Sequence, residues 1–434
     1  MQISNRFSFG VLLTLTARVL MAANSVLAGV LVARLLGAGN LGILVVVNIT
    51  VATAVQISSL GLPTANTYFT ARDRETLVPA TVNGAIFAVF GGFLCAFAVW
   101  LCSPLFLLGV PLEIVTLGLL SVPFQLLSLV IFNLFLAQGE VKRFNYLDFL
   151  NQSFVLINAV LVLVVFGGGL LMLVTFNLAT AAGMSFLSVV IFYRYLAIGF
   201  DGINWRGDLG LFVRMLRYAL KGHVHWVAIT VIMRSDVIIV NHFAGTIEAA
   251  VYGVATQYTL FLMLLPNVVA NLMLQRVASS PDEASKFSCA AARHISCALF
   301  AACLLSIPLV QLLPVVYGSA FAGAPFLAWL LLPGVFFYGV QMALTQYFVG
   351  TGLPKLIPAV WVATLILNLV LNFLVVPKFG ATGAALVSTF CYAFAFIIII
   401  IAFRKWTGHH LSEILICNRE DFRRFRAFIK FGVA

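Results

Sequence analysis

Two arginines and one aspartate lie inside long apolar runs of this sequence. Arg18 stands seven residues into a run that starts near residue 11, and Arg234 and Asp236 stand near the middle of the run 222–243. A central Arg or Asp costs about 2.5–3.5 kcal/mol on membrane-insertion scales, so such residues usually face an internal cavity, a partner or water. An unpaired guanidinium in a water-filled cavity binds phosphate or carboxylate through paired hydrogen bonds. The chemistry we predict is therefore anion recognition.

Helical spacing groups the polar residues around Arg234. One face of the run 222–243 carries His223, Thr230, Arg234 and Asn241. Their spacings of 7, 4 and 7 positions keep them on that face. His225 and Asp236, 11 positions apart, form a stripe on a nearly opposite face. Arg234 and Asp236 are two positions apart and should not pair with each other.

The first apolar run shows a similar face, shared by Thr14, Arg18 and Ser25. The residues that we predict to bind substrate are Arg18, Arg234, His223, Thr14 and Asn241. The residues that we predict to act in coupling or gating are Asp236 and His225. Two further stripes are Asp148, Asn151, Gln152 and Asn158, and Thr364, Asn368 and Asn372. For the Asn and Thr stripes, interhelical hydrogen-bond seams are the favoured alternative.

Other short motifs do not indicate enzyme chemistry. Gly37–Gly42 matches GxGxxG, but no acidic residue follows about 20 positions on, so we interpret it as a tight turn between two helices. His223-x-His225 and His409-His410 resemble metal-ligand pairs, yet such pairs near a membrane interface are more often ordinary polar residues. The seven cysteines include no CxxC pair, which argues against a zinc site or disulfide framework. We expect no metal and no cofactor, apart from a possible coupling ion, H⁺ or Na⁺.

The composition explains where these charges must lie. Of the 434 residues, 62% are hydrophobic and only 9% are charged, against about 25% charged in soluble domains. The excess apolar surface must face lipid, which predicts an all-α polytopic membrane protein. The net charge of +11 fits membrane orientation better than nucleic-acid binding, because the basic residues sit between apolar runs.

We predict about twelve transmembrane helices, each of roughly 20 apolar residues. They span 11–33, 42–62, 81–103, 112–136, 148–166, 170–193, 222–243, 249–272, 294–317, 324–349, 358–376 and 381–403. Of the 25 lysines and arginines, 21 then fall on one side, Arg34 and Lys378 on the other, and Arg18 and Arg234 within spans. This asymmetry predicts that both termini are cytoplasmic.

The chain divides into two related halves. A shift of 213 residues places Gly139 on Gly352 and Lys142 on Lys355, and internal duplication is common in transporters. The predicted parts are a six-helix bundle over 1–193, a cytoplasmic linker with an amphipathic helix over 194–221, a second six-helix bundle over 222–403, and a basic cytoplasmic tail over 404–434.

Several short segments form a recognisable set: 31–37 (LVARLLG) with 40–42 (NLG), 59–63 (SLGLP), 234–239 (RSDVII), 243–245 (FAG) and 252–253 (YG). Together they resemble segments of Wzx-type polysaccharide flippases of the multidrug/oligosaccharidyl-lipid/polysaccharide exporter superfamily. One departure is 249–252 (AAVY), where the family often has Gly before the aromatic residue. The resemblance implies two six-helix bundles around a central cavity, an undecaprenyl-pyrophosphate-linked oligosaccharide as substrate, and alternating access.

Three functions remain open on the sequence. The first is a flippase for O-antigen, capsule or exopolysaccharide repeat units in the bacterial cytoplasmic (inner) membrane. The second is a cation-coupled multidrug antiporter of the same superfamily, which would need acidic cavity residues. The third is a membrane polysaccharide polymerase or ligase, for which the outer loops offer few acids. The partners that we expect are the lipid-linked oligosaccharide, membrane lipids and other polysaccharide-assembly proteins.

Overall fold

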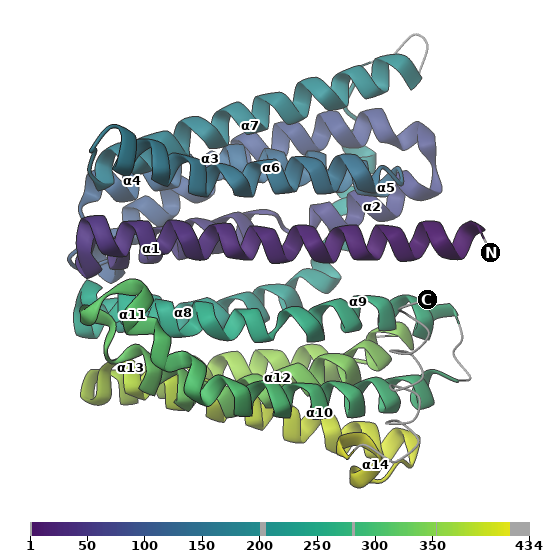
Figure 1. The fold of residues 1–434 in the computed structure, drawn as a ribbon. Helices are drawn as coiled ribbons and strands as arrows, with labels where there is room; N and C mark the ends of the chain where they lie inside the picture. The colour runs from purple at the N-terminus through teal and green to yellow at the C-terminus, as the bar shows by residue number, and fades with distance from the viewer. Residues whose placement is uncertain (1, 200–204, 280–282, 353, 417–434) are drawn as a thin grey trace. The chain divides into compact units, whose positions relative to one another are not determined.

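The protein is helical throughout the part that the structure describes. A computed structural model describes residues 2–199, 205–279, 283–352 and 354–416, and the side chains of residues 2–15, 199, 221, 271, 272, 274–276, 278 and 279 lie outside this description. Within these ranges there are helices and turns but no β-strand (Figure 1). The predicted all-α fold class is confirmed.

The helices are bounded as follows. The first part of the chain contains α1 (Gln2–Ser58), α2 (Leu62–Arg72), α3 (Leu77–Phe106), α4 (Leu112–Leu120), α5 (Val122–Ala137), α6 (Val141–Ala159) and α7 (Leu170–Gly199). The second part contains α8 (Leu209–Leu262), α9 (Leu264–Ser279), α10 (Ala284–Leu309), α11 (Leu313–Tyr317), α12 (Ala324–Gly350), α13 (Leu356–Thr407) and α14 (Leu411–Leu415).

Three of these helices are each long enough to hold two of the predicted spans. Gly37 interrupts α1, Gly245 interrupts α8 and Gly380 interrupts α13, with φ of 86°, 87° and 54°. Glycine adopts positive φ without steric cost, so it can break a helix at a single residue. Nine helices in the described part are long and apolar enough to cross a membrane. Counting each broken helix as two segments gives the predicted twelve.

The chain forms two compact units. The first comprises Met1–Gly253 together with Val316–Ala322 and Val376–Ala381, and the second comprises Val254–Val315, Gly323–Val375 and Thr382–Ala434. By contacts, therefore, the segment 222–253 packs within the first unit. The predicted division at 194–221, like the central cavity that the resemblance implies, stays a prediction.

The amphipathic part of the linker is the beginning of α8. Its apolar residues Leu211 and Met215 are almost fully buried and pack with Leu62 and Ala65 of α2 and with Ala80 of α3. Burial of side chains of this size contributes about 1.5–3 kcal/mol each. This face therefore packs against other helices of the first unit.

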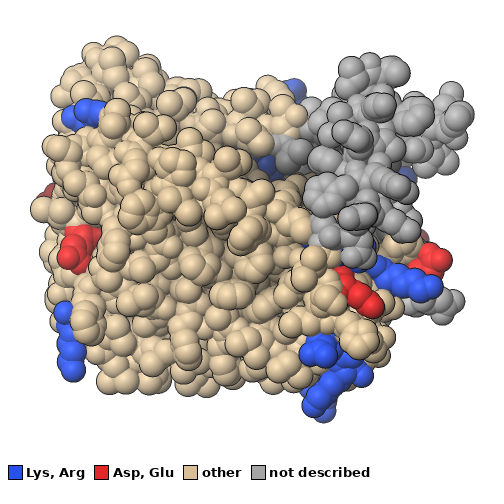
Figure 2. Space-filling model, turned by 60° about the horizontal axis from the view of Figure 1, so that its bottom comes forward, with Lys and Arg blue, Asp and Glu red and all other residues tan. Residues whose placement is uncertain are grey.

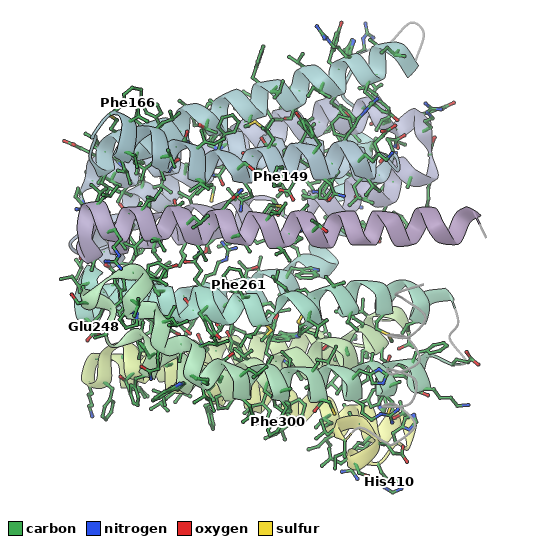
Figure 3. All side chains as sticks on the ribbon, in the orientation of Figure 1. Phe149, Phe166, Glu248, Phe261, Phe300 and His410 are labelled. Atoms are coloured by element: carbon green, nitrogen blue, oxygen red, sulfur yellow. The ribbon has the colours of Figure 1, made fainter. Side chains whose placement is uncertain are left out.

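The outer surface is apolar along the helices. Phe166, just after the helical segment that follows α6, and Phe300 of α10 are labelled in Figure 3 and are 57% and 59% exposed. The face in Figure 2 is largely free of Lys, Arg, Asp and Glu, which gather toward its edges. Large exposed apolar surface of this kind is stable in contact with lipid. The chain is a multi-pass membrane protein.

Candidate anion site on helix α8

Arg234 lies in the middle of the first arm of α8, between the start of the span at Gly222 and the break at Gly245. Its side chain is partly buried. Among the described residues, the structure records no hydrogen bond or ion pair for it, and none of its nitrogens is fully enclosed without a partner. The guanidinium therefore keeps donors available for a ligand.

The face of α8 that carries Arg234 is fixed at both ends. The Nε2 atom of the buried His223 lies 3.2 Å from the carbonyl oxygen of Ile57 in α1. Asn241, 1% exposed, donates from Nδ2 to the carbonyl of Leu108, after α3, at 3.0 Å. These two bonds direct the face toward other parts of the first unit. Both side chains are engaged with backbone here, and their role as substrate ligands stays a prediction.

Asp236 lies on a different face of the same arm. It is 3% exposed, and its Oδ2 accepts a hydrogen bond from the hydroxyl of Tyr252 at 3.2 Å. Tyr252 follows the Gly245 break, so this bond joins the two arms of α8. As the spacing predicts, no pair with Arg234 is recorded. His225 is also buried, and the coupling or gating roles of Asp236 and His225 stay predictions.

Arg18 has a carboxylate partner. Its Nη2 lies 3.1 Å from Oδ2 of Asp148 in α6, with the two side chains 45% and 20% exposed. One and a half turns further along both helices, Asn24 Nδ2 donates to Ser153 Oγ at 3.3 Å. Arg18 is thus not an open anion receptor in this structure, and an anion would have to displace Asp148. Thr14, predicted to line the same face, lies outside the described side chains.

The sequence analysis did not pair Arg18 with Asp148, nor Asp236 with Tyr252. A signal for the first pair was present, since opposite charges in two apolar spans require partners. Tyr252 gave no comparable signal, because a tyrosine in an apolar helix is common. Which helices are neighbours depends on long-range packing that the spacing within one helix does not contain.

One asparagine of the polar stripe on α6 forms hydrogen bonds between helices. The buried Asn158 donates from Nδ2 to Asn177 Oδ1 and to Thr180 Oγ1 of α7, both at 2.9 Å. In the second unit, Thr364 and Asn372 of α13 bond to carbonyls of their own helix, at 2.7 Å and 3.0 Å. The interhelical seam, the alternative to a binding role, is therefore observed for Asn158.

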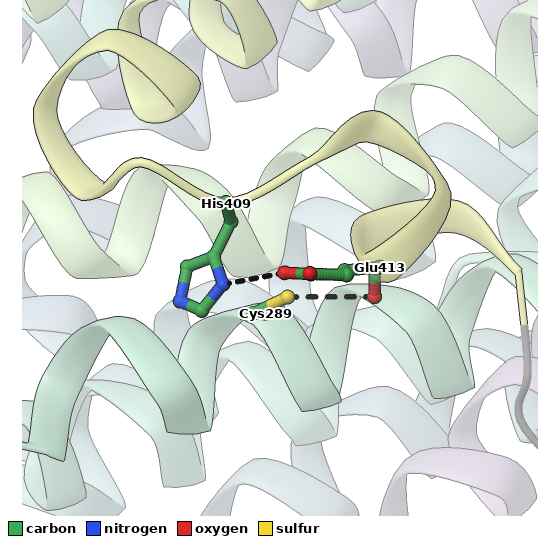
Figure 4. Close-up of side chains that lie close together, drawn as sticks. All are labelled: Cys289, His409 and Glu413. Carbon is green, nitrogen blue, oxygen red and sulfur yellow. Dashed lines mark hydrogen bonds and ion pairs between the residues drawn. The ribbon is translucent and has the colours of Figure 1, made fainter.

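A cluster of metal-ligand residue types lies in the second unit, where Cys289, His409 and Glu413 place ligand atoms within 4.8 Å of one another (Figure 4). Cys, His and Glu all bind zinc. Here they bond to each other: His409 Nδ1 lies 2.8 Å from Glu413 Oε2, and Cys289 Sγ donates to the Glu413 carbonyl at 3.4 Å. Arg293 donates to the same carbonyl at 3.1 Å, which places a positive charge beside the cluster.

These bonds attach α14 to α10. The hydrogen bond with His409 is the main cause that lowers the pKa of Glu413 from its ordinary value. A lowered carboxyl pKa means that the ionised form is the one that the contact favours. We interpret the cluster as a structural contact, and the expected absence of a bound metal stays a prediction.

Comparison with known proteins identifies a family that matches the sequence and solved structures that share the fold. The sequence pattern of a family described as "Polysaccharide biosynthesis protein" matches residues 9–279. No curated protein matches the sequence. Among solved structures, the lipid II flippase MurJ in an inward closed conformation has a TM-score of 0.74 at 12% identity, covering 90% of this chain and 87% of its own.

Two transporters show the same fold. An inward-facing multidrug resistance MATE family transporter of the MOP superfamily has a TM-score of 0.68 at 13% identity, covering 91% of this chain and 98% of its own. A MOP superfamily transporter from Pyrococcus furiosus has a TM-score of 0.62 at 14% identity, covering 92% and 94%. The resemblance seen in the sequence is thus confirmed at the level of family and fold.

Proposed function

We propose that this chain, which belongs to the polysaccharide biosynthesis protein family, is a flippase for a lipid-linked oligosaccharide. The substrate is an undecaprenyl-pyrophosphate-linked repeat unit for O-antigen, capsule or exopolysaccharide, and it crosses the bacterial cytoplasmic membrane by alternating access. The family match supports the polysaccharide role. The fold that the chain shares with a lipid II flippase supports lipid-linked transport.

Arg234 is the observation that carries the proposal. A guanidinium in the middle of an apolar helix, with no partner among the residues that the structure describes, is unfavourable unless something else satisfies it. A pyrophosphate offers several anionic oxygens in the geometry that arginine binds through paired hydrogen bonds. The lipid tail can stay in the bilayer while the head group meets this residue.

The other predicted residues have different parts in the proposal. Arg18 becomes a second phosphate ligand only when Asp148 releases it. Breaking the Arg18–Asp148 ion pair is therefore a step between the substrate-free and the substrate-bound state. Asp236, held by Tyr252, is the proposed coupling or gating group together with His225, with H⁺ or Na⁺ as the coupling ion. Other polysaccharide-assembly proteins are the proposed partners, with both chain termini in the cytoplasm.

The test is replacement of Arg234 in cells that make a surface polysaccharide with this protein as their flippase. Arg234→Gln should lower surface polysaccharide about tenfold or more, because a charge-assisted hydrogen bond contributes about 1.5–3 kcal/mol. Arg234→Lys should retain part of the activity, since the charge remains but the paired geometry is lost. Protein abundance is measured in the same cells, and translocation of the lipid-linked oligosaccharide is measured in proteoliposomes.

Arg206→Gln is the matched control, because it removes one positive charge from an exposed position before α8. It should leave polysaccharide unchanged. If Arg234→Gln also leaves polysaccharide and translocation at the wild-type level, the proposed role of Arg234 is wrong.

The structure gives less support to a cation-coupled drug antiporter. That chemistry favours an available carboxylate within the spans. Of the two aspartates considered for it, Asp148 is paired with Arg18, which leaves Asp236, with its hydrogen bond from the Tyr252 hydroxyl, as the one carboxylate of the two for a coupling ion. Drug sensitivity of a deletion strain separates the two functions. A polymerase or ligase role would instead require formation of a glycosidic bond by the purified protein.

A further inference from the structure

A pocket of about 290 Å³ lies between the first turns of α6 and the later part of α7. Its lining residues are Lys142, Arg143, Tyr146, Leu147 and Ile191. Lys142 and Tyr146 are exposed, so the pocket opens on the surface, while Leu147 is buried and forms part of an apolar wall. None of these residues belongs to the site on α8.

The exposed lining of this pocket is almost wholly apolar, and two of the residues that line it, Lys142 and Arg143, carry a positive charge at the ends of their side chains. Lys142 is exposed and has no recorded hydrogen bond or ion pair within the described part of the chain. Arg143 is held by Glu140, with Nε 3.5 Å from Oε2, and by the ring of Tyr195, 5.0 Å from the guanidinium carbon. Glu140 offsets one charge, so the net charge at the mouth is positive and Lys142 is its available cation.

Aromatic residues place the pocket at the depth of lipid head groups. Tyr146 is 65% exposed at the pocket. Two residues beyond Ile191 on α7, Tyr193 stacks on Trp205 with ring centroids 5.3 Å apart, and the two residues are 53% and 41% exposed. Exposed Tyr and Trp gather at the boundary between hydrocarbon and water.

An apolar surface continues from the pocket along both helices. On the α6 side, Ile157 lies 11 positions after Tyr146, which keeps it on nearly the same face of the helix, and it is exposed. Val160 and Val164, in the π-helical segment that follows α6, are exposed as well. On the α7 side, Leu187 lies one turn before Ile191 and is also exposed. A ligand bound here thus meets positive charge at one end and hydrocarbon-like surface along its length.

We propose that this pocket binds an anionic phospholipid of the surrounding leaflet. The phosphate contacts Lys142 and Arg143, and the acyl chains follow the exposed apolar residues of α6 and α7. A water-soluble anion would use the charges but not the apolar surface, whereas a zwitterionic lipid would meet the cations with an ammonium group of its own. Basic pockets between transmembrane helices bind anionic lipid head groups. This lipid is a bound component and not the transported cargo.

The experiment uses the purified full-length protein and phosphatidylglycerol, with the zwitterionic phosphatidylcholine, which has no net charge, as the comparison. Retained lipid is counted by native mass spectrometry, and affinity is measured by titration into detergent micelles. Lys142→Gln should weaken phosphatidylglycerol binding about fivefold, and Lys142→Glu should weaken it further. Binding should also fall as salt is raised.

Lys355 provides a matched control. It stands 213 positions after Lys142 at the equivalent place in the second half, is exposed, and is not part of this pocket. Lys355→Gln and Lys355→Glu remove the same charges and should leave the affinity within twofold of wild type. Equal losses in the two pairs of variants, or equal binding of both lipids by the wild type, would overturn the proposal. Neither readout depends on transport, so failure of the flippase assignment leaves this test intact.

Discussion

Arg18 and Arg234 are the same residue type in the leading helices of the two predicted halves, yet their surroundings differ. Arg18 lies against the carboxylate of Asp148 at 3.1 Å, whereas Arg234 has no recorded partner in the described part of the chain. A paired arginine stabilises helix packing, and an unpaired one remains available for an anion. This difference assigns Arg234 as the proposed first contact for the substrate and Arg18 as a group that must exchange partners.

The Arg18–Asp148 pair predicts a charge-reversal result. Asp148→Asn removes the partner and should lower the free energy of unfolding by about 1 kcal/mol, a modest value because Arg18 is nearly half exposed. Arg18→Gln should have an effect of similar size. The double variant with Arg18→Asp and Asp148→Arg restores opposite charges and should recover most of the loss. The measurement is thermal unfolding of the detergent-solubilised protein.

A double-mutant cycle isolates the interaction from other effects of each substitution. The loss of unfolding free energy in the charge-reversed double variant is compared with the sum of the losses in Arg18→Asp alone and Asp148→Arg alone. If the double variant loses as much as that sum, the two side chains do not stabilise each other and the pair has no structural role.

Helix breaks at single glycines determine how the elements approach one another. After the Gly37 break, α1 returns with Gly42 against the backbone of Thr246, the residue that follows the Gly245 break in α8. A Cβ on Gly42 would lie 1.8 Å from the Thr246 carbonyl oxygen. The two breaks therefore pack together through a contact that has no room for a side chain.

Another element-scale contact supports the break in α13. Glu248, labelled in Figure 3 close to the α8 break, accepts the backbone N–H of Ala381 through Oε2 at 3.0 Å. Ala381 begins the second arm of α13 immediately after Gly380. A carboxylate at a helix N-terminus satisfies an otherwise unpaired N–H and interacts favourably with the helix dipole. The glycine provides the break and the glutamate stabilises the helix that follows.

Gly42→Ala should destabilise the protein by about 1–3 kcal/mol, because the backbone of Thr246 or of α1 must move to make room. Gly39→Ala is the matched control, since its Cβ would meet nothing closer than Ile247 Cγ1 at 4.0 Å. That control should be neutral or slightly stabilising, as alanine is the better helix former. Thermal unfolding of both variants in the same detergent is the measurement, and equal unfolding temperatures would contradict the close approach.

At the scale of the whole molecule, the sequence predicts the apolar segments better than their packing. Their number follows from local apolar length, and it agrees with the structure once Gly37, Gly245 and Gly380 are read as breaks between paired segments. The packing of 222–253 within the first unit was not predictable, because it depends on contacts between residues far apart in the chain. For the same reason, the charge of Arg18 within an apolar span indicated that it needs a partner, but the spacing within one helix did not identify Asp148 as that partner.

The orientation of the molecule is the whole-molecule prediction that remains to be tested. Positive charges are retained on the cytoplasmic side of membrane proteins, and only Arg34 and Lys378 fall on the opposite side in the proposed topology. We expect Lys378→Cys, in a background without the native cysteines, to react with a membrane-impermeant maleimide in intact cells. Lys355→Cys should react only after the membrane is permeabilised. Both positions are exposed, so the difference in labelling reports sidedness. Reversed labelling would invert the topology. Labelling of both positions in intact cells would place both outside, and the single predicted crossing between them would then be wrong.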